Sequence, residues 1–177
     1  MRRIKSRKSF LVIILTLIIS LSATGAYYWL QHGPNKTPPA IDNVGNSVVP
    51  DSITRSVNFP VYYPDPAKLP SGYTLNRSSF SNPVKNGVYY SASYGNGKKI
   101  AFSVQAKPSD SELASFKSSY IPLRIEYGTS VGQAEIGAYQ NKTLVSLPIL
   151  NGPWIVITAP PDINQEDLKS ILSAMKH

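Results

Sequence analysis

The feature that most constrains this chain is a long uncharged segment near its N-terminus. No Lys, Arg, Asp or Glu occurs between Ser9 and Asn35, and the segment contains an apolar run from Phe10 to Leu30. As a helix rising about 1.5 Å per residue, this run extends roughly 30 Å, the thickness of the hydrocarbon core of a bilayer. We therefore expect residues 10–30 to form a transmembrane helix, with the lipid bilayer as a partner.

The residues that flank this segment predict its orientation. Basic residues precede it, and basic flanks stay in the cytoplasm. Aromatic residues close its other end, as in the aromatic belt of a membrane–water interface. We expect a single-pass protein of the cell membrane, with a cytoplasmic tail over residues 1–9 and the C-terminal part outside. The basic residues are Arg2, Arg3, Lys5, Arg7 and Lys8, and the aromatic residues are Tyr27, Tyr28 and Trp29.

A cleaved signal peptide is the alternative interpretation. The apolar residues up to Leu21 suffice for its central region, and small residues permit cleavage near Ala26, which would release a secreted protein. The aromatic cluster directly after that site favours a retained signal-anchor, because it completes a full membrane span.

Most of the net charge belongs to this topology signal. The chain has 18 basic and 10 acidic side chains, and a net charge of +8 by itself suggests a polyanionic partner. Residues 31–177, however, carry 13 basic and 10 acidic side chains, a net of only +3. The part outside the membrane lacks a basic excess, so we expect no nucleic-acid partner.

The remainder divides into a linker and one folded domain. Residues 31–58 are rich in Pro, Asn and Ser without a helical or strand period, which predicts an extended linker. Residues 59–177 are long enough for one modest hydrophobic core. We expect them to form an extracytoplasmic α+β domain.

The clearest hairpin lies at residues 88–106, where apolar and polar residues alternate on both sides of a glycine-rich turn. A two-residue turn at residues 96–97 would place apolar side chains opposite polar ones. A three-residue loop at residues 95–97 instead pairs Tyr90 with Phe102. Because glycine adopts positive φ freely, we expect the longer loop.

Two amphipathic helices are predicted. Ser109 and Glu112 have the spacing of a capping box, and Asn164 is a favourable N-cap for a second helix. Apolar residues at helical spacing follow each cap. They are Leu113, Phe116 and Tyr120 in the first helix, and Leu168, Ile171, Leu172 and Met175 in the second.

Several further strands complete the predicted fold. Asn151-Gly152 indicates a type I′ turn between the last two strands. Hairpin connections imply antiparallel pairing, so the fold class is α+β, with an antiparallel sheet of about six to eight strands and both helices on one face. The further strands are expected at residues 59–64, 73–80, 123–127, 131–139, 143–150 and 154–158.

The residues available for chemistry argue against an enzyme. The chain has no cysteine, and its two histidines, His32 and His177, lie in the linker and at the last position. A thiolate nucleophile, a histidine-based triad and a histidine metal site are therefore excluded within the core of the domain. We expect no catalytic residue, no metal and no cofactor.

Two weaker patterns have simple explanations. Ser173 and Lys176 match the S-x-x-K pattern of serine acyl-transferases, but the last helical turn is no catalytic cleft. Glu126 and Glu135 lie on neighbouring predicted strands, where we expect solvated carboxylates rather than the acid pair of a glycosidase.

The candidate binding residues lie on the hairpin. Alternation directs Tyr90 toward the core and places Tyr89 on the opposite face of the sheet, in a polar group that could bind a glycan or a partner protein. An ordinary solvated sheet face is the alternative. The group consists of Tyr89, Ser91, Ser93, Ser103 and Gln105.

A resemblance to a known group rests on Tyr63-Pro64, on residues 69–73 (Leu-Pro-Ser-Gly-Tyr), on Trp154 and on the closing helix. These features resemble uncharacterised bacterial single-pass membrane proteins with a small extracytoplasmic domain, a type also found in anti-sigma and sporulation regulators. The cytoplasmic tail of nine residues is too short to hold a sigma factor. The resemblance implies an outer domain without catalytic residues.

These observations predict a non-enzymatic membrane-anchored domain that senses or binds an envelope or membrane protein. A module for a glycan or a small amphiphile is the alternative, and a hydrolase is less favoured because the domain has no cysteine and its one histidine is the terminal residue His177.

Overall fold

The computed structural model describes residues 47–95 and 97–177. These residues belong to the second of two units into which the chain divides, at residues 46–177. Within the described residues no helix is both long and apolar enough to cross a membrane. The predicted cytoplasmic tail, the anchor at residues 10–30 and the aromatic residues 27–29 lie outside the described part.

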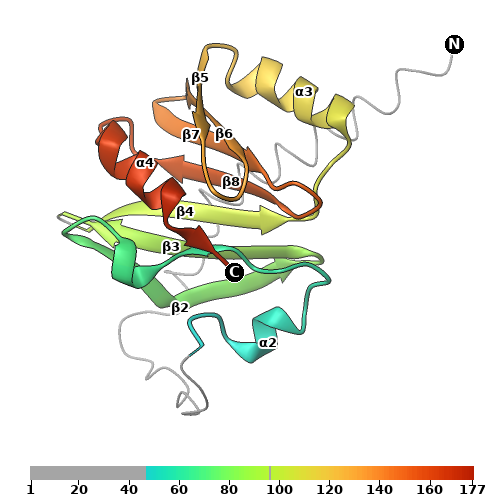
Figure 1. Ribbon diagram of the computed structural model, residues 1–177, viewed down its shortest axis with the longest axis vertical. Coiled ribbons are helices and arrows are strands. Elements are labelled where there is room, and N and C mark those ends of the chain that lie inside the picture. Colours follow the sequence, from blue (N-terminus) through green and yellow to red (C-terminus); the bar gives the residue numbers. More distant parts are fainter. Residues whose placement is uncertain (1–46, 96) are drawn as a thin grey trace, which may run out of the picture. The chain divides into compact units, whose positions relative to one another are not determined.

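A seven-stranded antiparallel sheet forms the centre of the domain, in the order β2-β3-β4-β8-β7-β6-β5 (Figure 1). The two halves are meanders, β2–β4 and β5–β8, joined where β4 pairs with β8. This confirms the α+β class and the antiparallel pairing. The strands are β2 (Tyr73–Val84), β3 (Gly87–Tyr94), β4 (Lys98–Gln105), β5 (Arg124–Gly128), β6 (Gln133–Tyr139), β7 (Lys142–Pro148) and β8 (Trp154–Ala159).

Short elements and two longer helices surround this sheet. β1 pairs with β9 in a small separate ladder, in which Tyr63 lies opposite Lys176. The helix α3 joins the two meanders, and α4 follows the last strand of the sheet. The elements are α2 (Asp51–Thr54), β1 (Tyr63–Pro64), the 3-10 helix η1 (Pro66–Lys68), α3 (Asp110–Tyr120), α4 (Gln165–Ser173) and β9 (Met175–Lys176).

The β3–β4 hairpin has the register that the alternation predicts. Tyr90 lies opposite Phe102, and Tyr94 opposite Lys98, which leaves residues 95–97 as the loop. Gly95 and Gly97 have φ values of 52° and 78°. A two-residue turn would have moved every apolar side chain of one strand to the other face.

The main hydrophobic core lies on one face of the sheet, here called the core face. Tyr90 stacks on Phe102, with ring centroids 4.7 Å apart, and Ile157 lies opposite Phe102 on β8. The helix α4 covers this face with Leu168, Ile171 and Leu172, which are fully buried. Asn164 caps α4 through its side chain, as predicted.

The other side of the sheet, here called the second face, holds a smaller apolar cluster under α3. Ser109 and Glu112 form the predicted capping box, and the helix packs Phe116 edge-on against Trp154 at 4.8 Å. Leu144 and Val156 are also buried on this face.

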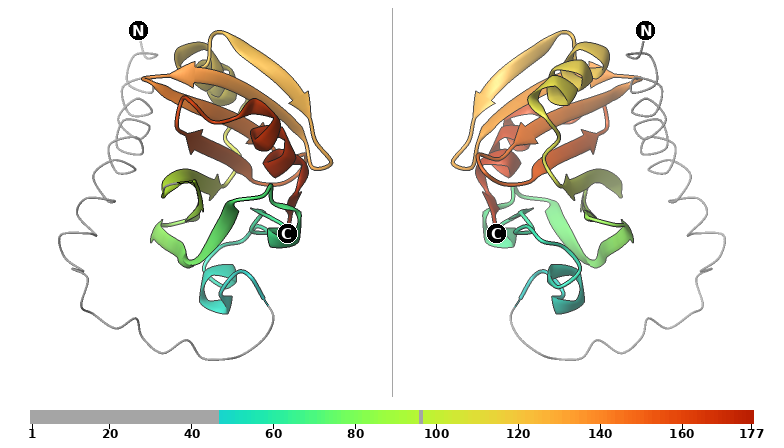
Figure 2. Two further views of the ribbon diagram at one scale, coloured as in Figure 1. Left: turned by 90° about the vertical axis from the view of Figure 1, so that its left-hand side faces the viewer. Right: turned by 90° about the vertical axis from the view of Figure 1, so that its right-hand side faces the viewer.

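The prediction that both helices cover one face is therefore wrong: α3 and α4 lie on opposite sides of the sheet (Figure 2). The physical reason is that β8 carries apolar side chains on both faces of the sheet. Trp154 and Val156 face α3, whereas Ile155 and Ile157 face α4, so each face needs its own cover.

The folded unit begins earlier than the expected boundary at residue 59. Residues 51–54 form α2, and Val49 and Ile53 are buried in the main core. Residues 47–49 form no strand. The C-terminal part of the predicted linker thus belongs to the domain, because it supplies apolar side chains to the core face.

The turn at residues 149–153 also differs from the expected type I′ hairpin. Asn151 has a φ of 54°, but Pro148 pairs with Trp154, so the loop has five residues. A two-residue turn with positive φ at both positions lies instead between β6 and β7, where Gln140 and Asn141 have φ values of 47° and 57°. Positive φ at both positions is the mark of a type I′ turn.

Candidate functional site

The structure brings the predicted binding residues together on the second face. Tyr89 lies opposite Ser103 in the β3–β4 ladder, and Ser91 and Ser93 follow on the same side of β3. Gln105, at the end of β4, lies opposite Trp154. We call the group formed by Tyr89, Ser91, Ser93, Ser103 and Gln105 the Tyr89 surface.

The Tyr89 surface lies beside α3 and not beneath it. The helix contacts β6 and β8, through Lys117 with Glu135 and through Phe116 with Trp154. Over β2–β4 most side chains of this face are at least partly accessible, and Thr74, Asn76 and Lys99 are exposed. The part of the second face over β2–β4 is therefore mainly polar, with Lys99 as a charged residue and Val84 as an exposed apolar one.

The Tyr89 ring lies along the sheet. Its Cε2 and Oη atoms lie 3.3 and 3.6 Å from the position that a Cβ atom on Gly87 would occupy, so the ring passes over the glycine. Tyr89 is half-buried, and this burial raises the pKa of its phenol. Ser103 is almost completely buried beside it, with 2% of its surface exposed. The exposed part of such a ring can stack on a ligand.

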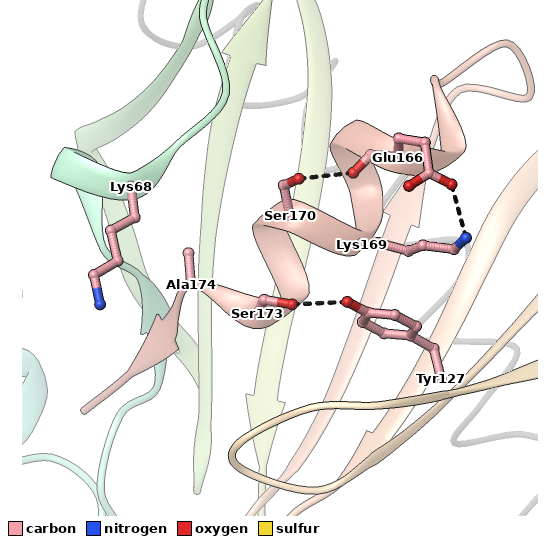
Figure 3. Close-up of a pocket in the computed structure, with 7 residues that line it drawn as sticks. All are labelled: Lys68, Tyr127, Glu166, Lys169, Ser170, Ser173 and Ala174. Carbon is pink, nitrogen blue, oxygen red and sulfur yellow. Dashed lines mark hydrogen bonds and ion pairs between the residues drawn. The ribbon is translucent and has the colours of Figure 1, made fainter.

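A second candidate site is an open cavity of about 330 Å³ beside α4 (Figure 3). It lies between η1, the end of β5 and the exposed side of the helix. Its residues are Lys68, Tyr127, Glu166, Lys169, Ser170, Ser173 and Ala174.

The polar groups of this cavity bond mainly to one another. Lys169 Nζ donates to Glu166 Oε1 at 2.8 Å, and this hydrogen bond raises the pKa of the lysine. Ser173 Oγ lies 2.9 Å from Tyr127 Oη, and Ser170 donates to the backbone of Glu166. The serine hydroxyls therefore have partners that are not general bases, which does not favour nucleophilic catalysis.

The S-x-x-K pattern is not a catalytic pair. Ser173 bonds to Tyr127, whereas Lys176 lies on β9 and pairs with Asp65 at 3.1 Å. The hydrogen bond from Lys176 lowers the pKa of Asp65. Lys176 also lies 5.7 Å from the centre of the Tyr63 ring, so it fastens the small β1–β9 ladder.

The two glutamates face each other across β5 and β6, as register partners. Glu126 is exposed, but Glu135 is buried, so the expectation of two solvated carboxylates is wrong for Glu135. The reason is a local ion cluster: Lys117 Nζ lies 2.6 Å from Glu135 Oε1, and Arg124 Nε lies 3.2 Å from Oε2. Two cations hold this carboxylate, which is unlike the acid pair of a glycosidase.

Sequence reasoning missed this ion cluster and the cavity. Lys117 follows Phe116 on α3, so its position above β6 depends on which face the helix covers. The cavity depends on where η1 meets α4. In the described part of the chain, no group of three or more His, Cys, Asp or Glu residues is placed to hold a metal ion.

Comparisons with known proteins give no further assignment. No family model, curated protein or solved structure matches this chain.

Proposed function

We propose that this protein is a membrane-anchored, non-enzymatic binding protein, whose domain outside the cytoplasm uses the Tyr89 surface to bind another protein of the envelope or membrane. The observation that carries the proposal is the uneven cover of the second face. α3 buries its half over β6–β8, while the polar half over β2–β4 stays accessible.

The composition of the Tyr89 surface suits a protein partner. Hydroxyl and amide groups surround one half-buried tyrosine, and charged residues are few. Protein interfaces are enriched in tyrosine and depleted of charge at their centres. The ring is already held against the sheet, so a partner would lose little side-chain entropy by ordering it.

The proposed anchor rests on the sequence. Residues 10–30 have the length and composition of a membrane span, and the preceding basic residues orient it. Two measurements test this part. Membranes carrying the protein are washed with alkaline carbonate, and the N-terminus of the mature chain is identified by mass spectrometry. Release by the wash, or a mature chain that begins near residue 27, contradicts the anchor.

The binding proposal is tested by capture from envelope extract with the full-length chain. The captured protein is then purified, and its affinity is measured for the wild type and two variants. Tyr89→Ala removes the ring, and Ser91→Arg places a bulky charge on the same surface. Each is expected to weaken binding at least ~10-fold, the effect of altering a hot-spot residue near the centre of an interface. Ser118→Arg, on the exposed side of α3, is the matched control and should bind as the wild type does.

A glycan is the second candidate ligand, and the position of the Tyr89 ring over Gly87 favours it. Sugars stack on aromatic rings that lie flat beside hydroxyl groups, and Ser91 and Ser93 provide the hydroxyls. Binding of purified wall polysaccharide that Tyr89→Ala abolishes, without a protein partner, would replace the first candidate by this one. If none of the variants changes any binding, both candidates for this surface are wrong.

A further inference from the structure

The two edges of the seven-stranded sheet differ in their protection against pairing. β2, at one edge, contains Pro83 and shows two register shifts against β3. Prolines and bulges at an edge prevent another strand from adding to it. β5, at the other edge, contains no proline, and each of its five residues pairs in register with β6. β5 is therefore the edge that can accept another strand.

This open edge also exposes apolar side chains. Ile125, in the middle of β5, has 52% of its surface exposed, and Leu123, just before the strand, has 88% exposed. Ile125 lies opposite Ile136 and thus on the core face, at the margin that α4 leaves uncovered. Tyr127 follows on the same face and is half-buried. An exposed apolar edge strand is a typical site of strand addition.

The charges on β5 are complementary to those of a second copy of β5 that runs antiparallel to it. Arg124 and Glu126 flank Ile125, and both point to the second face. Glu126 is exposed and forms no ion pair with any other described residue. Arg124 contacts Glu135, but its side chain keeps 34% of its surface exposed. An antiparallel copy of β5 would offer a carboxylate to Arg124 and a guanidinium to Glu126.

We propose that two copies of this protein associate through β5, which pairs antiparallel with β5 of the second copy about a twofold axis at Ile125. Ile125 then lies opposite Ile125 of the second copy, Arg124 opposite Glu126, and Leu123 opposite Tyr127. The two sheets join into one, and the core faces of both copies lie on the same side. Each contact occurs twice, as a twofold interface requires.

The charges of β5 select this register over its neighbours. A shift by two residues in one direction places Arg124 opposite Arg124, and a shift in the other direction places Glu126 opposite Glu126. Like charges directly opposite each other destabilise a pair of strands. A shift by one residue would place apolar side chains of one copy beside charged ones of the other. Of these registers, only the one centred on Ile125 places opposite charges across from each other and apolar side chains across from apolar side chains.

The absence of cysteine makes a cross-linking test unambiguous. The full-length chain is purified in detergent, single cysteines are introduced, and disulfide formation is followed under mild oxidation. Ile125→Cys should give a covalent dimer, because directly opposed residues bring their Cβ atoms within about 5.5 Å. Val84→Cys, equally exposed on the β2 edge, is the control and should stay monomeric. A mixture of Leu123→Cys and Tyr127→Cys chains should cross-link, whereas neither variant should do so alone.

A charge variant tests the same register without a new covalent bond. Glu126→Lys places a lysine opposite Arg124 of the second copy and should weaken dimerisation at least ~10-fold, as measured by light scattering over a range of concentrations. The variant should remain folded, because its lysine lies beside Glu135 within the chain. Glu166→Lys makes the same charge change on α4 and should leave dimerisation unchanged. Circular dichroism of both variants verifies the fold.

Two results would overturn the proposal. The first is a wild-type chain that stays monomeric at every concentration, which would leave the edge to another protein or to residues 1–46. The second is a dimer that Glu126→Lys does not weaken and that Ile125→Cys does not cross-link. Such a dimer would form through other surfaces, for example the anchor.

Discussion

Glu135 accepts a hydrogen bond from Lys117 Nζ at 2.6 Å, and this bond fastens α3 to the second face of the sheet. The carboxylate lies on β6 with 7% of the residue exposed, and Arg124 approaches its other oxygen from β5. A buried carboxylate between two cations contributes little net stability when intact. Removal of the carboxylate, however, leaves the positive charges of Lys117 and Arg124 unpaired in a partly desolvated environment.

We therefore expect Glu135→Gln to lower the free energy of unfolding by about 1–3 kcal/mol, less than for a fully buried pair because both cations are partly exposed. The control is Glu126→Gln, directly opposite on β5, which should change it by less than about 0.5 kcal/mol. Urea unfolding of dilute protein measures both values. Equal effects of the two substitutions would mean that the ion cluster has no special role.

The local parts of this fold follow from the sequence. The alternation from Val88 to Val104 and the requirement that apolar faces match are enough to determine the register of the β3–β4 hairpin. The spacing of Ser109 and Glu112 is enough to place the start of α3. In both cases the interaction joins residues close in the chain, so no knowledge of the tertiary structure is needed.

The parts that failed depend on contacts between distant residues. Which face α3 covers decides whether Lys117 meets Glu135, and the helix itself does not reveal that choice. A signal was present in β8, whose residues 154–157 are all apolar and thus indicate a strand buried on both sides. The Tyr89 surface was placed correctly by alternation, but its accessibility depends on how far α3 extends over the sheet.

The tyrosines predict a loss of stability at alkaline pH. Burial, and then the hydrogen bond to Asp167 at 3.0 Å, raise the pKa of Tyr73, and burial raises that of its stacking partner Tyr94. Above pH 10, the ordinary phenol value, the unfolded chain loses these protons while the folded chain keeps them. The free energy of unfolding therefore falls as the pH rises above 10.

Tyr73→Phe should make this alkaline decline shallower, because one titrating phenol is removed. At neutral pH the free energy of unfolding of the variant should be lower by about 0.5–1.5 kcal/mol, because the hydrogen bond to Asp167 is lost. Thr74→Val, next to it on β2, removes no titrating group and should keep the wild-type slope. The measurement is urea unfolding at several values between pH 8 and 11. An unchanged slope for Tyr73→Phe would show that its pKa is similar in the folded and unfolded chains.

Gly137 marks a close approach between the sheet and the residues that follow α3. A Cβ atom at this position would lie 2.8 Å from both Cβ and Cγ2 of Ile121, and 3.0 Å from the backbone oxygen of Leu123. Ile121 is fully buried and β-branched, so it has little freedom to move aside.

Gly137→Ala is therefore expected to lower the free energy of unfolding by about 1–3 kcal/mol through overpacking. Gly128→Ala is the matched control on β5, where the nearest atom is the Gln133 side chain at 3.7 Å. It should be neutral or slightly stabilising, because alanine loses less backbone entropy than glycine on folding. Thermal unfolding distinguishes the two, and a stable Gly137→Ala variant would indicate that the end of α3 shifts easily.

The β6–β7 turn stores backbone strain that a single substitution can release. Asn141 has a φ of 57° in a two-residue type I′ turn, the conformation that glycine adopts without steric cost. Asn141→Gly should raise the free energy of unfolding by about 0.5–1 kcal/mol, even though glycine loses more entropy on folding. Ser81→Gly, at an exposed strand position of β2, is the control and should lower it by a similar amount. Urea unfolding of both variants measures these opposite signs, and a destabilised Asn141→Gly variant would mean that asparagine is held in this turn by more than its backbone conformation.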